Sequence, residues 1–381
     1  MSFIITIFAL LCCSISLTKA NFFGKVSNIQ ESIIPLINKE TQAHPYRNAN
    51  LLRPSHLWDY INVSHYKGNP SEYQVEKNIG EGTFAQVFEG IHLPTGDRVA
   101  LKFCYTPRAD QFFRREIQIL QELEDAPNFL PIRDMYEVKG VNGKDILVLV
   151  FDLFRVPLYR NVFKNFTKFQ IKHFIYETLR TLDYAHSKGI IHRDLKPVNI
   201  LMNPDTLETR VIDWGLADYY HPEKELGTLI STMPFKSPEI LLDFGHYDYS
   251  VDIWSTGCIL AEMIFKKIYF FGKDFSKESN DKVSPKYRDN VDKLNVIVKV
   301  LGTADLLEYV NKHKEFMNAE LLKYVEMHEK VPLTDFINDK NRDLVDPLAI
   351  DLLEKMLVID HTERITASDA LQHPYFDDIR I

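Results

Sequence analysis

The pattern of apolar residues changes once along this chain, and that change limits the folds that the chain can adopt. From Tyr73 to about Leu149, apolar and polar residues alternate in short runs separated by glycine-containing turns, which is typical of strands. One segment of this region, residues 112–123, instead has apolar residues at helical spacing and ends before Pro127. Beyond about Leu158, helical spacing dominates.

These two regions predict an α+β fold with two lobes. The clearest strands are expected at residues 73–79, 86–91 and 98–103, and the later helices at residues 167–187, 251–265, 291–300 and 347–357. Thr167 is the expected N-cap of the first later helix, and Gly189 is expected to end it. We expect a small strand-rich lobe at 73–150, a connection at 151–157 and a larger helical lobe at 158–378.

The size and charge of the chain set broad limits on its class. With 381 residues, of which 45% are hydrophobic, the chain is long enough to bury a large core in two lobes. The formal net charge of −8 argues weakly against nucleic acid or an anionic membrane as the main partner. We therefore expect no nucleic-acid partner.

The N-terminus differs from the rest of the chain. Residues 3–17 form an almost uncharged apolar run, and Thr18-Lys19-Ala20 places small residues at the cleavage-defining positions. A secretory signal peptide cut before Asn21 fits this pattern, although no Lys or Arg precedes the run. A run of about 15 residues is short for a bilayer of about 30 Å, so no stable membrane span is expected after cleavage. A retained signal anchor and a misassigned start codon are the alternatives.

Residues 21–72 contain four prolines and no sustained periodicity, which predicts an extended arm over the domain. Two glycosylation sequons, at Asn62 and Asn165, agree with a secretory location. The mature chain would keep only Cys104 and Cys258, which fall in different lobes. We expect two buried thiols rather than a disulfide.

A glycine-rich turn follows the first strand. Its residues are Gly80, Glu81, Gly82, Thr83, Phe84 and Ala85, and the next strand begins near Val87. Glycines at such a turn let the backbone approach a phosphate closely. A dinucleotide-binding turn would open a helix here, whereas this chain resumes a strand, so a phosphate-covering hairpin is favoured. An ordinary hairpin turn is the simpler alternative for this motif alone.

The third strand carries Lys102, and the following helix carries Glu116. A lysine at this position can reach the α and β phosphates of a nucleotide if a carboxylate holds its flexible amine. Taken alone, the two residues could equally be a surface lysine and a solvated glutamate.

The run His192-Arg193-Asp194-Leu195-Lys196-Pro197-Val198-Asn199, followed by Asp213-Trp214-Gly215, carries the strongest signal. Phosphoryl transfer needs a carboxylate to accept the hydroxyl proton, cations on the phosphates and oxygen ligands for metal ions. Asp194 suits the base and Lys196 suits the γ-phosphate. Asn199 and Asp213 suit Mg²⁺, which prefers hard oxygen ligands.

With Ser237-Pro238-Glu239, these motifs resemble the signature set of eukaryotic protein kinases over residues 73–376. The resemblance implies a serine/threonine kinase that uses ATP and Mg²⁺ and has protein substrates. It also implies that Asp252 supports the catalytic loop from a buried helix, and that Arg364 pairs with Glu239.

A narrower resemblance is to the casein kinase 2 catalytic subunits of the CMGC group. It is carried by the Trp in Asp213-Trp214-Gly215, by Tyr247-Asp248-Tyr249-Ser250, by Lys299-Val300-Leu301-Gly302-Thr303 and by the arm residues Arg53, Trp58 and Tyr60. The resemblance implies an arm that packs on the activation loop through Trp58 and Tyr60, and a possible regulatory beta subunit. It also implies an adenine site at Val87, Ala100, Phe151, Asp152, Phe154, Leu201 and Ile212.

The sequence departs from that family where acidic substrates would bind. Residues 109–115 are mostly neutral where casein kinase 2 has a lysine-rich run, and around the activation segment only Lys236 remains of its basic residues. Recognition of a carboxylate needs such cations, so a changed substrate set is expected. An inactive pseudokinase scaffold, or a secreted binding module built on the same fold, are the alternatives to an enzyme. A cytoplasmic or nuclear location, as in the resembled family, is the alternative to the secretory pathway.

Overall fold

The computed structural model describes most of the chain from Pro45 onward. The described residues are 45–55, 68–82, 85–105, 110–140, 143, 145–155, 165–222, 224–272 and 283–380. The predicted signal peptide, most of the arm, and residues Trp58, Tyr60, Asn62, Thr83 and Phe84 lie outside these ranges. Within them, no helix has both the length and the apolar character that crossing a membrane requires.

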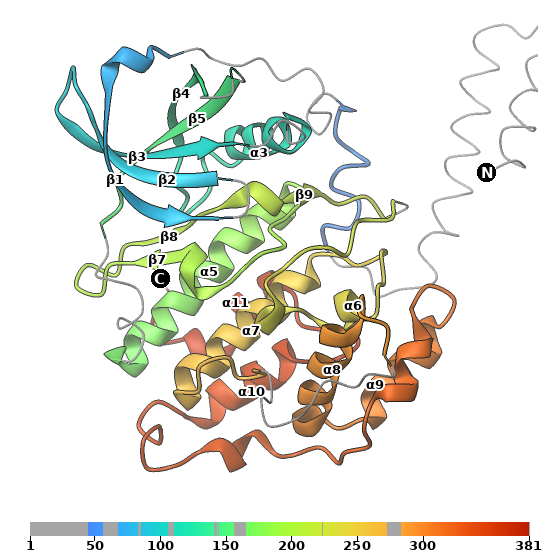
Figure 1. Cartoon of the computed structure of the whole chain (residues 1–381). Coiled ribbons are helices and arrows are strands. Elements are labelled where there is room, and N and C mark those ends of the chain that lie inside the picture. The colour runs from blue at the N-terminus through green and yellow to red at the C-terminus, as the bar shows by residue number, and fades with distance from the viewer. Residues whose placement is uncertain are drawn as a thin grey trace, which may run out of the picture. The chain divides into compact units, whose positions relative to one another are not determined.

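A five-stranded antiparallel sheet forms the first part of the described fold. Its strands are β1 (Tyr73–Glu81), β2 (Ala85–His92), β3 (Asp97–Cys104), β4 (Ile132–Lys139) and β5 (Asp145–Asp152), in the order β1-β2-β3-β5-β4. Helix α3 (Asp110–Glu122) connects β3 to β4, and the 3-10 helix η3 (Pro70–Glu72) precedes β1 (Figure 1).

The alternation along β3 decides which of its side chains enter the core. Val99 and Leu101 are fully buried, whereas Ala100 and Lys102 are half-buried. Because successive side chains of a strand point to opposite faces, Lys102 lies on the face opposite the valine and leucine. The sheet thus uses one face of β3 for packing and leaves the other for a polar site.

Helices dominate the second part of the fold. They are α5 (Lys168–Ser187), α6 (Pro238–Leu241), α7 (Ser250–Phe265), α8 (Arg288–Leu301), α9 (Ala304–His313), α10 (Pro347–Met356) and α11 (Ala367–Leu371). Short antiparallel pairs β6 (Ile190–Ile191) with β9 (Asp218–Tyr219), and β7 (Ile200–Met202) with β8 (Thr209–Val211), follow α5. The described residues of this part also form six 3-10 helices. They are η6 (Pro197–Asn199), η7 (Trp214–Leu216), η8 (Met233–Phe235), η9 (Ala319–Tyr324), η10 (Leu333–Phe336) and η11 (Pro374–Phe376).

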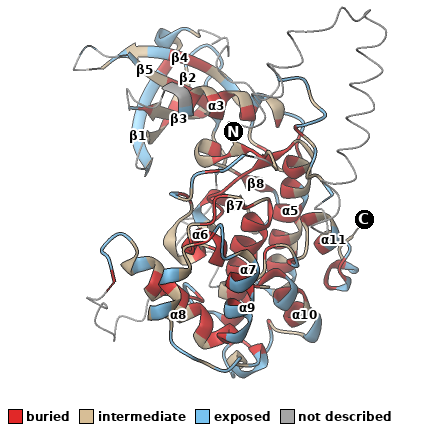
Figure 2. Ribbon diagram, turned by 90° about the vertical axis from the view of Figure 1, so that its right-hand side faces the viewer, coloured by how far each residue is buried: buried red, intermediate tan, exposed pale blue. Residues whose placement is uncertain are grey.

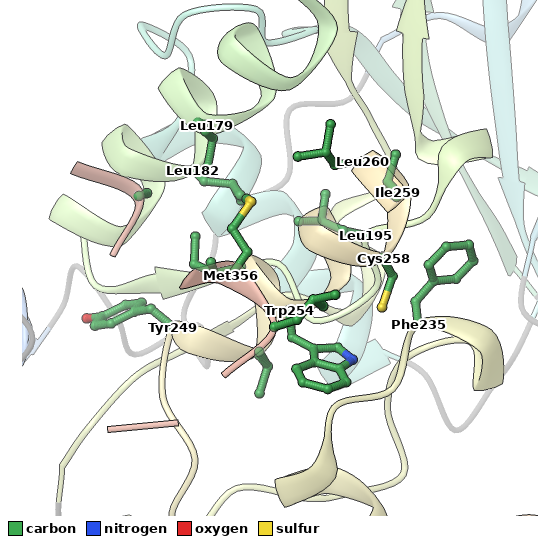
Figure 3. Close-up of a cluster of buried hydrophobic side chains, with 14 of the residues drawn as sticks. Leu179, Leu182, Leu195, Phe235, Tyr249, Trp254, Cys258, Ile259, Leu260 and Met356 are labelled. Carbon is green, nitrogen blue, oxygen red and sulfur yellow. The ribbon is translucent and has the colours of Figure 1, made fainter. Parts of the chain in front are cut away.

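Helix α7 is the centre of the helical core. Every residue of α7 except Glu262 is buried, as expected for a helix that is apolar on all sides. Figure 2 shows buried residues concentrated on α5 and α7. In Figure 3, Trp254 and Leu260 of α7 gather with Leu182 of α5 and Met356 of α10.

Local signals set the ends of α5. The Thr167 hydroxyl accepts a hydrogen bond from the backbone N–H of Gln170 at 3.2 Å, and the Gln170 side chain accepts one from the backbone N–H of Thr167 at 2.8 Å. This reciprocal pair is a capping box. At the other end Gly189 has a φ of +74°, a conformation that favours glycine.

The predicted α+β architecture is confirmed. The predicted strands and helices agree with the observed bounds to within three residues at each end. Cys104 and Cys258 are free and buried, as expected.

Candidate active site

Lys102, Glu116 and Asp213 come from three separate elements and meet at one place. The Nζ of Lys102 on β3 lies 2.5 Å from Oε1 of Glu116 on α3, and 3.1 Å from Oδ1 of Asp213. Only 3% of the Glu116 side chain is exposed, because α3 turns it inward against the sheet. The flexible lysine amine is therefore held in one position by two carboxylates.

The charges of this group determine its protonation. Burial by itself would lower the pKa of Lys102, but the carboxylates of Glu116 and Asp213 outweigh burial and hold the pKa above its usual value. The Lys102 ammonium in turn holds the pKa of Asp213 below its usual value. Lys102 is thus a fixed cation and Asp213 a fixed anion at neutral pH.

Gly215 keeps the space beside these charges open. A Cβ on Gly215 would lie 3.4 Å from oxygens of Asp213 and Glu116, and 3.6 Å from Nζ of Lys102. These are ordinary van der Waals distances, so alanine would also fit here, and the lack of a side chain leaves the space beside the charged group open.

Strands β1 and β2 pair up to Glu81 and Gln86, on the two sides of the glycine-rich turn. The backbone N–H of Gly82 donates to the carbonyl of Ala85 at 2.9 Å. Gly80 pairs with Val87, and Val87 pairs with Lys102 on the next strand. Gly80, Val87 and Lys102 are therefore opposite one another on three adjacent strands. Glu81 and Gly82, at the start of the turn, are exposed.

The carboxylate of Asp194 is held from two sides. Its Oδ1 accepts hydrogen bonds from the backbone N–H and the hydroxyl of Thr232, both at 2.9 Å. Its Oδ2 lies 2.6 Å from Nζ of Lys196, which also contacts the Thr232 hydroxyl at 3.2 Å. Nothing in the local sequence around Thr232 indicates this role, because its partner Asp194 lies 38 positions away.

The loop that carries Asp194 rests on helix α7. The two oxygens of Asp252 accept the backbone N–H groups of His192 and Arg193, each at 2.8 Å. His186 of α5 lies 3.0 Å from the same carboxylate. Arg193 has a φ of +67°, so this contact holds a backbone conformation that a non-glycine residue rarely adopts. Asp252 supports the loop as the resemblance implied.

Asn199 and Asp213 are placed to supply oxygen ligands. The Nδ2 of Asn199 donates to the backbone carbonyl of Asp194 at 2.9 Å, which leaves its Oδ1 as a possible ligand. The backbone N–H of Ile212 donates to the carbonyl of Asn199 at 2.9 Å and so ties the two segments together. Asp213 keeps an ionised side chain that is 47% exposed. This all-oxygen donor set fits Mg²⁺.

Trp214 fixes the segment after Asp213. Its indole is buried, lies 4.6 Å from the ring of His192 and 6.0 Å from the ring of Phe129, measured between centroids. Because His192 begins the catalytic loop, this packing couples Asp213 to Asp194.

The residues expected around adenine come from two sheets. Val87, Ala100, Phe151 and Asp152 lie on β2, β3 and β5 of the five-stranded sheet, with Phe154 just after it, whereas Leu201 lies on β7 and Ile212 just after β8. Ala100 pairs with Phe151 across β3 and β5, and Leu201 of β7 pairs with Arg210 of β8. The apolar members Val87, Ala100, Phe151, Leu201 and Ile212 are all half-buried. The exposed side chain of Asp152 turns to Arg133 at 2.8 Å, and Phe154 stacks against Arg210.

Asp218 is a second residue of the site that no sequence motif indicates. Its Oδ2 lies 2.9 Å from Arg193 of the catalytic loop and 2.8 Å from Arg115 of α3, the residue before Glu116. Both arginines are buried. One carboxylate on β9 therefore connects the catalytic loop to the helix that holds Lys102 in place.

The described part of the arm contacts the turn after α5, the residue after β9 and the end of α3. Asn50 donates to the carbonyls of Gly189 and Tyr220, at 2.8 and 2.9 Å. Arg53 forms an ion pair with Glu122 at the end of α3 and donates to the carbonyl of Lys188. The expected packing of the arm thus involves Asn50 and Arg53 among the described residues, while the contacts assigned to Trp58 and Tyr60 stay predictions.

A different cluster, His313, Asp360 and His361, also brings possible metal ligands together. Its carboxylate already accepts hydrogen bonds from Lys312 at 2.6 Å and from the Thr362 hydroxyl at 2.7 Å. These contacts give Asp360 a structural role between α9 and the loop after α10.

The buried ion pair between Arg364 and Glu239 completes the expected set. Its two hydrogen bonds measure 2.7 and 3.0 Å, and neither side chain is exposed.

A comparison with protein families gives a match of residues 73–376 to the model of the protein kinase domain. This match spans the sheet, the helices and every group described above from Gly80 to Arg364. ATP is the substrate that such a domain implies, together with a protein that receives the phosphate. The chain belongs to the protein kinase domain family, and it has the two-part α+β fold of that family.

Proposed function

We propose that this chain is an active serine/threonine protein kinase that transfers the γ-phosphate of ATP to protein hydroxyl groups. The observation that carries the proposal is the Asp194 carboxylate, held by Thr232 and Lys196. The anchored cation Lys102 and the oxygen donors of Asn199 and Asp213 supply the other groups that phosphoryl transfer needs.

In the proposed reaction, Asp194 orients the substrate hydroxyl and receives its proton. The hydroxyl oxygen forms a bond to the γ-phosphorus as the bond to the β–γ bridging oxygen breaks, and ADP leaves. Lys102 holds the α and β phosphates, and Lys196 offsets negative charge on the transferred group. Mg²⁺ bound by Asn199 and Asp213 would add further positive charge at the phosphates.

The preference for serine and threonine is proposed from the resemblance of the motif His192 to Asn199 to that of serine/threonine kinases. Only 8% of the Asp194 side chain is exposed, with Thr232 and Lys196 on both sides of the carboxylate. Lys196 therefore lies beside the proposed base, where the acceptor hydroxyl would be placed.

We further propose that the chain is similar to casein kinase 2 within the CMGC group, with activity that needs no phosphorylation of its own. Trp214, the arm residues Asn50 and Arg53, and the Asp218 bridge support this proposal. A regulatory beta subunit is part of the resemblance. Residues 227–235 of the activation segment carry no charged side chain, and the lack of cations there argues against strongly acidic substrates.

A location in the lumen of the secretory pathway, or outside the cell, is proposed from the apolar N-terminal run and the two sequons. Asn165 is exposed, as a glycosylated residue must be. A shift in electrophoretic mobility after endoglycosidase treatment, lost in Asn62→Gln and Asn165→Gln together, would support this location. A chain made in the cytosol would show no shift.

Purified protein with Mg-ATP and a serine/threonine peptide library tests the proposed activity. We expect Asp194→Asn to lower the transfer rate by about 100-fold or more, because the proton acceptor is lost. Asp335→Asn, an exposed change on η10, serves as the matched control and should leave the rate unchanged. No transfer, or transfer equal in Asp194→Asn, would instead support the pseudokinase alternative.

A further inference from the structure

Leu229 is the most exposed of the large apolar side chains among the described residues. Its exposed fraction is 91%, although leucine normally gains free energy from burial. It lies in the segment between β9 and α6, which contains Thr232, and follows Gly227 and Thr228.

The residues around Leu229 are held in place. The carbonyl of Gly227 accepts a hydrogen bond from the Tyr247 hydroxyl at 2.8 Å, and the Thr228 hydroxyl is bonded to Asp243. The backbone before Leu229 is therefore attached to the loop that precedes α7.

The backbone after Leu229 is attached to the catalytic loop. Ile230 is buried, and the Ser231 hydroxyl donates to the carbonyl of Arg193 at 2.6 Å. Thr232 then contacts Asp194. With anchors on both sides, the exposure of Leu229 is imposed by the fold and does not come from a loose loop.

The position of Leu229 is close to the base. Leu229 lies three positions before Thr232, and an extended chain rises about 3.3 Å per residue, so the backbone of Leu229 lies within roughly 10 Å of the backbone of Thr232, which contacts Asp194. A substrate residue one or two positions from the acceptor hydroxyl spans the same distance. On the catalytic loop, Val198 is also 50% exposed and adds a second apolar side chain.

Charge is missing where an acidic substrate would need it. Residues 227–235 carry no charged side chain. Lys236, the first cation after them, is half-buried, and burial lowers its pKa. Lys196 is already bonded to Asp194 and Thr232. A substrate carboxylate would therefore have no free cation to pair with among residues 227–236 and Lys196. An apolar substrate side chain could instead pack against Leu229.

We propose that Leu229 is a specificity-determining residue that selects substrates with a large apolar side chain within two positions of the phosphorylated serine or threonine. This inference rests on the proposed kinase activity and names the substrate class of that same site. Contact between the substrate side chain and Leu229 removes apolar surface of both from water, which strengthens binding.

A positional peptide library tests the inference with the full chain and Mg-ATP. Each position from three before to three after a central serine is varied in turn, and kcat/KM is measured for each peptide. We expect Leu, Ile or Phe to exceed Asp and Glu by about tenfold at one position within two residues of the serine.

Two substitutions test whether the side chain of Leu229 causes the preference for apolar residues. Leu229→Ala should reduce the preference to within about threefold through a higher KM, because the contact surface is lost. Leu229→Arg should reverse it in favour of Asp and Glu. Met327→Ala, at another exposed apolar residue between η9 and η10, is the matched control and should keep the wild-type preference.

The outcomes separate this inference from the proposed function. Transfer that depends on Asp194 but shows no apolar preference, or a preference that Leu229→Ala retains, would overturn the role of Leu229 and leave the kinase activity standing. Transfer to no peptide at all, with Asp194→Asn equal to the wild type, would overturn both.

Discussion

The two oxygens of the Asp194 carboxylate have different environments, and this asymmetry has a consequence for catalysis. Oδ1 receives two hydrogen bonds from Thr232, whereas Oδ2 faces the Lys196 ammonium. Thr232 therefore fixes the direction of the carboxylate. It also contacts Lys196, so a single hydroxyl orients both groups.

Removing that hydroxyl should slow the reaction without unfolding the protein. We expect Thr232→Ala to lower kcat by about tenfold, since a hydrogen bond to a charged group contributes about 1.5–3 kcal/mol and the backbone N–H bond remains. Thr232→Ser keeps the hydroxyl and should retain most of the activity. Steady-state kinetics of the two variants, with melting temperatures as a check on folding, measure the effect. Equal kcat in both variants would contradict the orienting role.

At the scale of elements, the site depends on how α3, β9 and the catalytic loop are joined. Asp218 on β9 bridges Arg115 of α3 and Arg193 of the loop, and Arg53 ties the arm to the end of α3. Each contact fixes α3, and α3 in turn carries Glu116 to Lys102. A carboxylate already present in the chain thus supplies negative charge to the buried arginine of the catalytic loop.

Asp218→Asn tests this bridge. The change leaves buried guanidinium groups with less compensating charge, and breaking a buried ion pair costs about 3–5 kcal/mol. We expect a lower melting temperature and a kcat reduced by about tenfold or more, and Asp218→Glu should restore part of both.

Phosphatase treatment of the wild type provides the complementary measurement. It should leave kcat unchanged, because the charge at Asp218 does not come from phosphorylation. A large loss of activity after dephosphorylation would show that a phosphate, rather than the Asp218 carboxylate, provides this charge.

At the scale of the whole molecule, one charged group lies at the edge of the helical core. Glu262 is the one residue of α7 that is not buried outright, yet burial of its carboxyl raises its pKa to about 7. It accepts the backbone N–H of Tyr269, and Lys293 of α8 is its charged neighbour. Burial also lowers the pKa of Lys293 to about 8, although its ammonium donates to the carbonyls of Pro234 and Phe271.

Glu262 should make the stability of the fold depend on pH. Because folding raises the pKa of the Glu262 carboxyl, the folded state binds the proton of this carboxyl more tightly than the unfolded chain does. The stabilising contribution is fully present below about pH 4.5 and is lost as the pH rises to about 7. Glu262→Gln keeps the acceptor for Tyr269 but removes the titration.

We expect Glu262→Gln to raise the free energy of unfolding at pH 8 relative to the wild type, by on the order of 2 kcal/mol, and to have less effect near pH 5. Urea unfolding at the two pH values measures this difference. Glu320→Gln, on the exposed side of η9, is the control and should show no such dependence. An equal effect of Glu262→Gln at both pH values would contradict the titration.

The sequence alone determined the elements of this protein and the identities of its chemical groups. Strands and helices follow from the spacing of apolar residues over a few positions, and Thr167 and Gly189 mark the ends of α5 by local hydrogen bonding and backbone conformation. The motif residues from Gly80 to Asp213 could be found in the same way, because the spacing within each motif is short.

Only the tertiary structure decided which of these groups act together and what surrounds them. Asp218 meets Arg115 across 103 positions of the chain, and Thr232 meets Asp194 across 38. Nothing in the local sequence encodes such contacts, because they depend on how the sheet packs against the helices. Whether Leu229 is exposed and Lys236 is shielded likewise depends on which surfaces that packing leaves in water.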